Sequence, residues 1–229
     1  MLSRLLQLSS PALPIGAYSY SSGLEAAIDG GVVHDETSAR QWVVDALQLA
    51  VGAFDAPLMV AAYRAWSAQP ACEPHALRAL NAQALAARES AELRLETEQM
   101  GFSLGRWIAD VCAGELAPTP AQRAALESLD PPALPLAWAL AAQRLGVTQA
   151  EAAESFLWSF AENQAMVLIK ALPIGQIAAQ RLLLALGPQV ADVARRACEL
   201  PPELWSSAAP GLAIASMRHE TQYSRLFRS

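Results

Sequence analysis

The sequence predicts an all-α protein, a single-domain helical bundle of roughly ten helices with a C-terminal tail. Alanine and leucine dominate it, β-branched runs are scarce, and no stretch alternates apolar with polar residues for long, which favours helix over strand. Hydrophobic residues make up 53% of the 229 positions and charged residues 17%, so the chain can bury one sizeable core. We expect a helical domain over residues 1–215 and a tail over residues 216–229.

Two helices are predicted in the first half of the chain. Asp35 is placed to cap a helix that runs through Gln48, with polar and apolar residues on opposite faces. A longer amphipathic helix follows, in which apolar residues and one threonine recur at alternating steps of four and three: Leu93, Thr97, Met100, Leu104, Trp107 and Val111. Glu92 and Glu96 lie off this stripe among arginines, and we interpret them as part of a charged helix face.

The second half of the chain carries clear helix signals. Thr119 with Gln122, and Thr148 with Glu151, have the spacing of capping boxes. Residues 135–145 are apolar nearly all round, which indicates a helix through the centre of the bundle.

Breakers divide the rest of the second half. A helix should end near Ala171, because Pro173 stops it. Two more helices are expected over residues 175–186 and 189–200, separated by the breaker Gly187-Pro188.

The pentapeptide Ala-Leu-Pro-Ile-Gly occurs twice, at residues 12–16 and 171–175. The residues that flank the two copies do not match, so no repeat architecture is indicated. We interpret both copies as helix-breaking turns between apolar segments.

The end of the chain differs from the rest because it is basic and rich in residue types that dominate protein interfaces. Its one acidic residue is Glu220, although the whole chain has a net charge of −6. The basic and apolar residues are Met217, Arg218, Tyr223, Arg225, Leu226, Phe227 and Arg228. One interpretation is a frayed terminus. The residue types favour the other, a partner-binding segment that folds on another protein.

Charge and hydropathy exclude several classes of function. The body of this acidic chain has no cluster of Lys and Arg, so nucleic acid is not an expected partner. The longest apolar stretches fall short of the roughly 20 residues that span a membrane, and the N-terminus lacks a secretory pattern. Three widely spaced cysteines do not indicate a disulfide framework. We expect a cytoplasmic protein with no membrane partner.

The motifs of common enzymes are missing. Lys170 is the one lysine, and neither a phosphate loop nor a GxSxG elbow occurs. His219-Glu220 begins like a zinc motif, but Tyr223 stands where the second histidine belongs. We therefore predict no catalytic residue, no metal site and no cofactor. A helical enzyme or small-ligand-binding protein with an apolar pocket stays open as an alternative, because distant residues can cluster in space.

Two segments closely resemble the UreF family of urease accessory proteins. They are Leu-Pro-Ile-Gly-Ala-Tyr-Ser-Tyr-Ser-Ser-Gly-Leu-Glu at residues 13–25 and Arg-His-Glu-Thr-Gln-Tyr-Ser-Arg-Leu-Phe-Arg-Ser at residues 218–229. Residues 88–94 and 170–180 also resemble motifs of the family, in the same order. Ala17 is a departure, since the family often has a second glycine there, so the backbone is less free at this position.

The resemblance implies an all-helical assembly factor without enzyme activity. Such a protein binds the accessory protein UreD, partly through its termini, and the GTPase UreG. It forms a homodimer and supports GTP-dependent nickel insertion into apo-urease. The phosphate loop would then lie on UreG, and the nickel ligands on UreG and urease.

Matching positions give the candidate partner-binding residues. They are Pro14, Gly16, Tyr18, Ser19, Tyr20, Glu25, Lys170, Pro173, Gly175, Gln176, Gln180, Arg218, His219, Glu220, Tyr223, Arg225, Leu226, Phe227 and Arg228. Lys170 resembles a family lysine that controls the GTPase, or it satisfies carbonyls at a helix end. The tyrosines are partner anchors or buried residues with hydrogen-bonded hydroxyls. Gln176 and Gln180 face UreG or solvent.

Overall fold

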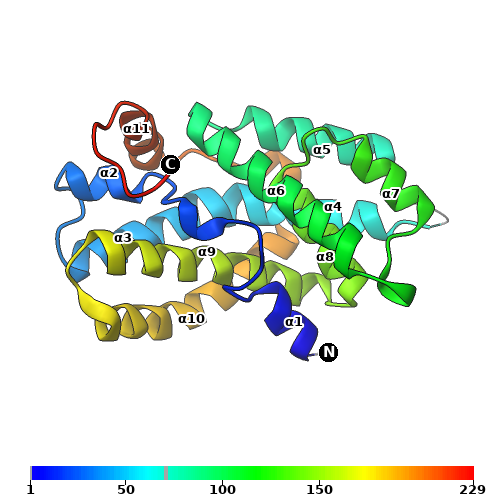
Figure 1. Ribbon diagram of the computed structural model, residues 1–229, viewed down its shortest axis with the longest axis horizontal. Coiled ribbons are helices and arrows are strands. Elements are labelled where there is room, and N and C mark those ends of the chain that lie inside the picture. Colours follow the sequence, from blue (N-terminus) through cyan, green and yellow to red (C-terminus); the bar gives the residue numbers. More distant parts are fainter. Residues whose placement is uncertain (1, 70–71) are drawn as a thin grey trace.

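The computed structural model describes residues 2–69 and 72–229, and within these ranges every regular element is helical (Figure 1). The all-α prediction is therefore confirmed. The α-helices are α1 (Leu2–Leu8), α2 (Leu24–Asp29), α3 (Glu36–Asp45), α4 (Ala56–Ser67), α5 (Pro74–Ala86), α6 (Ala91–Val111), α7 (Pro120–Glu127), α8 (Leu134–Leu145), α9 (Gln149–Ala171), α10 (Gly175–Glu199) and α11 (Pro210–His219). Short 3-10 helices are η1 (Ala17–Ser19), η3 (Gly114–Leu116) and η4 (Pro202–Leu204), and η2 (Ala46–Asp55) is a π-helix.

The helix that begins at Asp35 is longer than predicted. The carboxylate of Asp35 accepts a hydrogen bond from the backbone N–H of Ser38 at 2.7 Å, which confirms the cap. Helices α3, η2 and α4 then continue as one 32-residue helix. Pro57 cannot donate to the carbonyl of Ala53 four residues earlier. That carbonyl instead accepts a bond from Ser206 N at 3.1 Å.

This helix has the length and composition of a membrane span, a property that it shares with buried helices in soluble proteins. In this protein, 67% of its most apolar window is buried against the other helices. Polar residues such as Gln48 interrupt the apolar runs of this helix, so a search for long uninterrupted apolar stretches does not find it.

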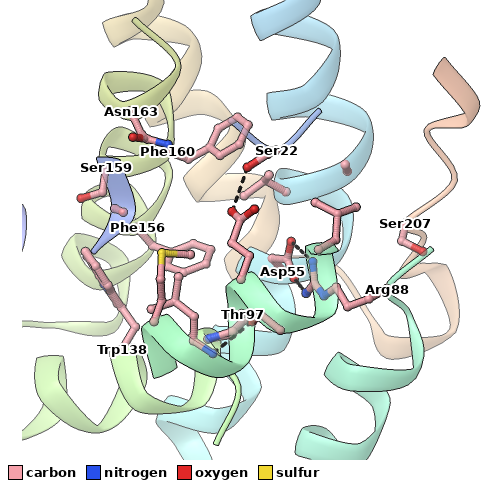
Figure 2. Close-up of a pocket in the computed structure, with 18 of the residues that line it drawn as sticks. Ser22, Asp55, Arg88, Thr97, Trp138, Phe156, Ser159, Phe160, Asn163 and Ser207 are labelled. Atoms are coloured by element: carbon pink, nitrogen blue, oxygen red, sulfur yellow. Dashed lines mark hydrogen bonds and ion pairs between the residues drawn. The ribbon is translucent and has the colours of Figure 1, made fainter. Parts of the chain in front are cut away.

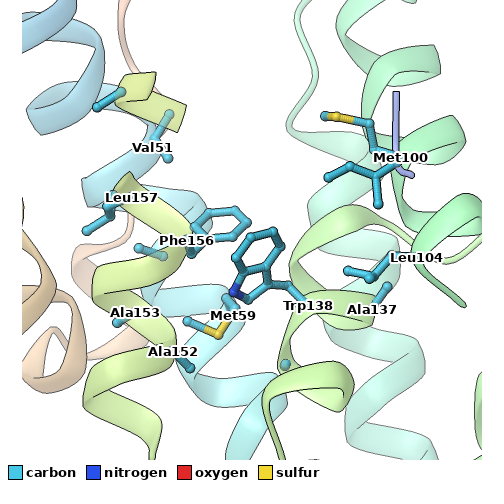
Figure 3. Packing of buried hydrophobic residues seen from close by; sticks show 14 of the residues in the cluster. Val51, Met59, Met100, Leu104, Ala137, Trp138, Ala152, Ala153, Phe156 and Leu157 are labelled. Atoms are coloured by element: carbon cyan, nitrogen blue, oxygen red, sulfur yellow. The ribbon is translucent and has the colours of Figure 1, made fainter. Parts of the chain in front are cut away.

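Helix α8 is the centre of the bundle, as its composition predicts. Its residues from Leu136 to Ala142 are fully buried. The ring of Trp138 meets the ring of Phe156 edge to face at 5.6 Å, an arrangement that aromatic pairs favour (Figure 3). Gly101 of α6 lets the backbone before α8 approach closely, because a Cβ there would lie 2.0 Å from the carbonyl oxygen of Pro132.

The predicted helix starts and faces are largely correct. Thr119 and Thr148 both form complete capping boxes. The apolar stripe of α6 is buried from Leu93 to Trp107, while Val111 is 49% exposed where the helix ends.

The break predicted at Gly187-Pro188 is wrong, because α10 runs unbroken through Pro188. The proline leaves the carbonyl of Leu184 without its helical donor. Leu184 is 82% exposed, so water can reach that part of the helix. Leu186 and Val190 are buried on either side of the proline, and their burial favours a continuous helix.

The two Ala-Leu-Pro-Ile-Gly segments are turns, as predicted, and they fold alike. In each, the isoleucine N–H donates to the leucine carbonyl two residues earlier at 2.8 Å, as in an inverse γ-turn around the proline. Gly16 and Gly175 follow with φ of 77° and 74°, in the left-handed region that favours glycine.

A candidate partner-binding site formed by both ends of the sequence

The two motifs at opposite ends of the sequence lie together at one end of the bundle, beside α2 and α11 (left in Figure 1). Ser21 N donates to the carbonyl of Ser229 at 2.9 Å, and Arg228 N donates to the carbonyl of Ser19 at 2.7 Å. Gly23 permits the contact between α2 and α11, because a Cβ there would lie 3.0 Å from Ser216 N. We call residues 220–229 the C-terminal strap.

The side chain of Glu25, in α2, binds the main chain of the strap. Its carboxylate accepts hydrogen bonds from the N–H groups of Leu226 at 2.7 Å and Phe227 at 2.9 Å. The same carboxylate lies 3.1 Å from Nε2 of His219, which is fully buried. Glu25 is itself buried, so its charge is directed at the strap and at α11 rather than at solvent.

Glu92, in the first turn of α6, holds the strap through side chains. Its two carboxylate oxygens lie 2.6 Å from Nδ1 of His219 and 2.6 Å from a guanidinium nitrogen of Arg225. In the other direction, the Glu220 carboxylate accepts a bond from Ala91 N at 2.7 Å, at the start of α6. Such an acceptor satisfies a backbone donor that every helix leaves free at its N-terminus.

Glu96 is one turn further along α6 and is buried. It accepts hydrogen bonds from the hydroxyls of Ser22 at 2.8 Å and Ser229 at 2.6 Å. Burial raises its pKa, although these two hydrogen bonds and the nearby guanidinium of Arg88 oppose the shift. The interpretation of Glu96 as part of a charged helix face is therefore wrong, because its side chain is buried. We call Glu25, Glu92 and Glu96 the carboxylate clamp.

No local sequence pattern marks Glu92 and Glu96 as members of this site. Their partners in α11 and the strap are 127 to 133 residues away along the chain. Helical spacing reports neighbours three or four residues apart, and it cannot reveal pairs of this kind.

The tyrosines of the N-terminal motif have different environments. Tyr20 is buried, and its hydroxyl donates to the side-chain oxygen of Gln99, which fits the second interpretation above. Burial raises its pKa. Tyr18 is half-buried, and burial together with the nearby charge of Glu162 raises its pKa to about 12.

Lys170 contacts the strap from α9. Its ammonium lies 5.2 Å from the centre of the Phe227 ring, within the range of a cation–π interaction. Phe227 is buried, whereas Lys170 is exposed. The structure therefore joins two candidate residues that are 57 positions apart in the sequence.

The remaining candidates at the start of α10 lie on the surface. Pro173, Gly175, Gln176 and Gln180 are exposed. They accompany two exposed apolar residues on the same helix, Ile177 at 74% and Leu184 at 82%.

Exposure divides the candidate residues into three groups. Four are buried within this chain: Tyr20, Glu25, His219 and Phe227. Tyr18 and Ser19 are half-buried. The exposed group contains Pro14, Gly16, Lys170, Pro173, Gly175, Gln176, Gln180, Arg218, Glu220, Tyr223, Arg225, Leu226 and Arg228. The expected boundary between residues 215 and 216 falls inside α11.

A cavity of about 120 Å³ lies between α6, α8, α9 and η2 (Figure 2). Trp138, Phe156 and Phe160 line one part of it, and the buried ion pair of Asp55 with Arg88 lines another. Residues 2–69 and 72–229 contain no group of three or more His, Cys, Asp or Glu side chains placed to hold a metal ion.

The protein is therefore an all-helical bundle in which several candidate residues, among them Glu25, His219 and Phe227, contact one another. Exposed aromatic and basic residues lie beside them, which is characteristic of a protein-binding surface. The family model named UreF matches residues 33–187. A urease accessory protein UreF of Azoarcus sp. is 49% identical over 228 residues, covering 100% of this chain and 95% of the relative. Those of Dechloromonas aromatica (47% identical; 100% and 97% covered) and Azotobacter vinelandii (48%; 98% and 97%) are also similar. The chain belongs to the UreF family of urease accessory proteins, which is a non-catalytic family.

Proposed function

We propose that this protein takes part in urease maturation by binding UreD and the GTPase UreG and by supporting GTP-dependent nickel insertion into apo-urease. The observation that carries the proposal is similarity to urease accessory proteins along the whole chain, at 49% identity. Nickel would be the cargo of the complex, and the nucleotide would bind to UreG. We further propose that the protein works in the cytoplasm as a homodimer.

Docking of UreD at the C-terminal end is supported by the character of its exposed residues. Tyr223 is fully exposed, with an exposed fraction of 105%, and Leu226 and Met217 are 67% and 46% exposed. Arg218 and Arg225 are exposed beside them. Aromatic, Met and Arg residues are enriched at protein interfaces, and Tyr and Arg at their hot spots.

A role for Lys170 toward UreG is supported by its position. It is exposed at the end of α9, one turn before the exposed start of α10. Its contact with Phe227 connects this surface to the strap. UreG bound at Lys170 and UreD bound at the strap would therefore occupy neighbouring surfaces of one protein.

Co-expression with UreD and UreG, followed by size exclusion with and without GTP, tests the proposal. We expect one peak with all three proteins and a change in its composition when GTP is added. Lys170→Ala should alter GTP turnover by UreG or urease activation without loss of the UreD complex. Elution of this chain apart from both partners would contradict the proposal. Unchanged GTP turnover and unchanged urease activation in Lys170→Ala would show that Lys170 has only a structural role.

A further inference from the structure

The cavity between α6, α8, α9 and η2 has the size and part of the lining that a small organic ligand needs. Its volume of about 120 Å³ is close to that of an engineered protein cavity of about 150 Å³ that binds benzene. The rings of Trp138, Phe156 and Phe160 line it together with aliphatic side chains such as Leu93. The cavity can therefore hold an apolar group about as large as a single ring.

The polar part of the lining is acidic. Figure 2 shows Asp55 and Arg88 on the side of the cavity opposite Trp138 and Phe156. These two residues form an ion pair, so their charges neutralise each other. The other ionisable residues in the lining are two carboxylates, the buried Glu96 and the exposed Glu89. This charge balance favours a positively charged ligand over an anionic one.

Glu96 is the buried carboxylate of this lining, and neutral groups bind it. Its two oxygens accept hydrogen bonds from the hydroxyls of Ser22 at 2.8 Å and Ser229 at 2.6 Å. The nearby guanidinium of Arg88 is paired with Asp55 instead. A buried charge is costly unless an opposite charge compensates it, and burial raises the pKa of Glu96 accordingly. An ammonium group in the cavity would supply the compensating charge.

Two buried polar atoms of the lining also lack a partner within residues 2–69 and 72–229. The side-chain nitrogen of Asn163 donates to the carbonyl of Tyr20 at 2.9 Å, but its side-chain oxygen accepts no hydrogen bond there. The indole N–H of Trp138 is unpaired in the same sense. Unpaired buried groups are rare in folded proteins, and a bound water or ligand is a common reason for them.

We propose that this cavity binds a small organic cation, an alkyl- or arylamine whose apolar body packs against Trp138 and Phe156 and whose ammonium group faces Glu96. The aromatic rings add to the preference for a cation, because the faces of their π systems attract positive charge. The inference goes beyond the proposed function, in which none of the partners is a small organic molecule.

The experiment titrates the isolated full-length chain with benzylamine and with benzyl alcohol by isothermal titration calorimetry at neutral pH. The two probes have the same ring and nearly the same size, and they differ in charge. The alcohol is a demanding control, because its hydroxyl oxygen can accept from the unpaired N–H of Trp138. We expect benzylamine to bind about tenfold more tightly, which corresponds to about 1.4 kcal/mol.

Three variants locate the binding. Glu96→Gln keeps the size of the side chain and removes its charge, so it should abolish the preference for the amine. Glu98→Gln should keep that preference, because Glu98 also lies on α6 but pairs with Arg94 at 2.8 Å and does not line the cavity. Ala50→Phe should fill the cavity and weaken both probes, and it keeps the proposal testable if Glu96→Gln is unstable.

Each possible failure contradicts a separate part of the proposal. If neither probe binds the wild-type chain, the cavity is not a ligand site. If amine and alcohol bind the wild type equally, the ligand is not selected by charge. A preference for the amine that persists in Glu96→Gln would overturn the role of that carboxylate, and undiminished binding in Ala50→Phe would place the ligand elsewhere.

Discussion

Helix α8 and the C-terminal strap are both fixed against the same bundle, but by different forces. Leu136 and Leu140 of α8 are fully buried among apolar side chains. The free energy gained by burying apolar surface is roughly proportional to the buried area and does not depend on direction. The strap has one large buried side chain, Phe227, and is otherwise held by carboxylates at defined distances. One region therefore depends on how well volume is filled, and the other on individual hydrogen bonds.

The largest effect that this difference predicts is in the core. Leu140→Ala should lower the free energy of unfolding by about 2–5 kcal/mol, because it removes a fully buried side chain and leaves a cavity. Urea denaturation followed by circular dichroism measures it. Leu184→Ala is the matched control, since the same substitution at an 82% exposed position should change little. Equal effects at both positions would contradict the assignment of α8 to the core.

The second effect is in the clamp. Glu25→Ala should lower the free energy of unfolding by about 1–3 kcal/mol, because the N–H of the buried Phe227 and the ring of His219 each lose an acceptor. The loss should be local, with the strap becoming accessible to proteases while α8 stays folded. Limited proteolysis with mass spectrometry can locate the cleavage. Glu98→Ala serves as the control, and equal cleavage of the two variants would argue against a specific role for Glu25.

The third effect concerns the charge buried at Glu96. Its raised pKa means that the folded state binds this proton more tightly than the unfolded state. The stability that it contributes is therefore present below the ordinary value of 4.5 and is lost as pH rises through the raised pKa. Glu96→Gln should remove this dependence and flatten the profile of unfolding free energy against pH. Parallel profiles for variant and wild type would contradict the buried charge.

The smallest effect is expected at Lys170. The cation–π contact with Phe227 lies at the surface, where such contacts contribute about 0.5–1 kcal/mol. Lys170→Ala should therefore leave the melting temperature nearly unchanged, whereas Lys170→Arg should keep the contact. A large loss of stability in Lys170→Ala would show that the lysine mainly holds the strap in place, and it would argue against the role proposed for Lys170 toward UreG.

The same difference explains what could be predicted from the sequence. The apolar composition of residues 135–145 was sufficient to predict α8, and the capping boxes at Thr119 and Thr148 involve partners only three residues away. The break predicted at Pro188 was wrong because the burial of Leu186 and Val190 outweighs the tendency of proline to end a helix. Local patterns thus describe the helices well and fail where tertiary packing decides.

The site was predicted only in part, for the same physical reason. Resemblance to the UreF family identified Glu25, His219 and Phe227 as members of two motifs, without any sign that these motifs touch. Glu96 was assigned to a charged helix face because arginines are its neighbours in the sequence, whereas its partners, Ser22 and Ser229, are distant in the sequence. Contacts between the two ends of a chain become visible only once the bundle has brought them together.

Amide hydrogen exchange at Leu226 and Phe227 in the isolated wild-type protein tests most directly whether the two terminal motifs form one site. Both N–H groups donate to Glu25, one to each carboxylate oxygen, so we expect slow exchange at both amides in the wild type. In Glu25→Gln one of the two oxygens becomes an NH2 group, so at least one of these amides should exchange faster while the amides of α8 stay unchanged. Unprotected exchange of both amides in the wild type would contradict a joined site.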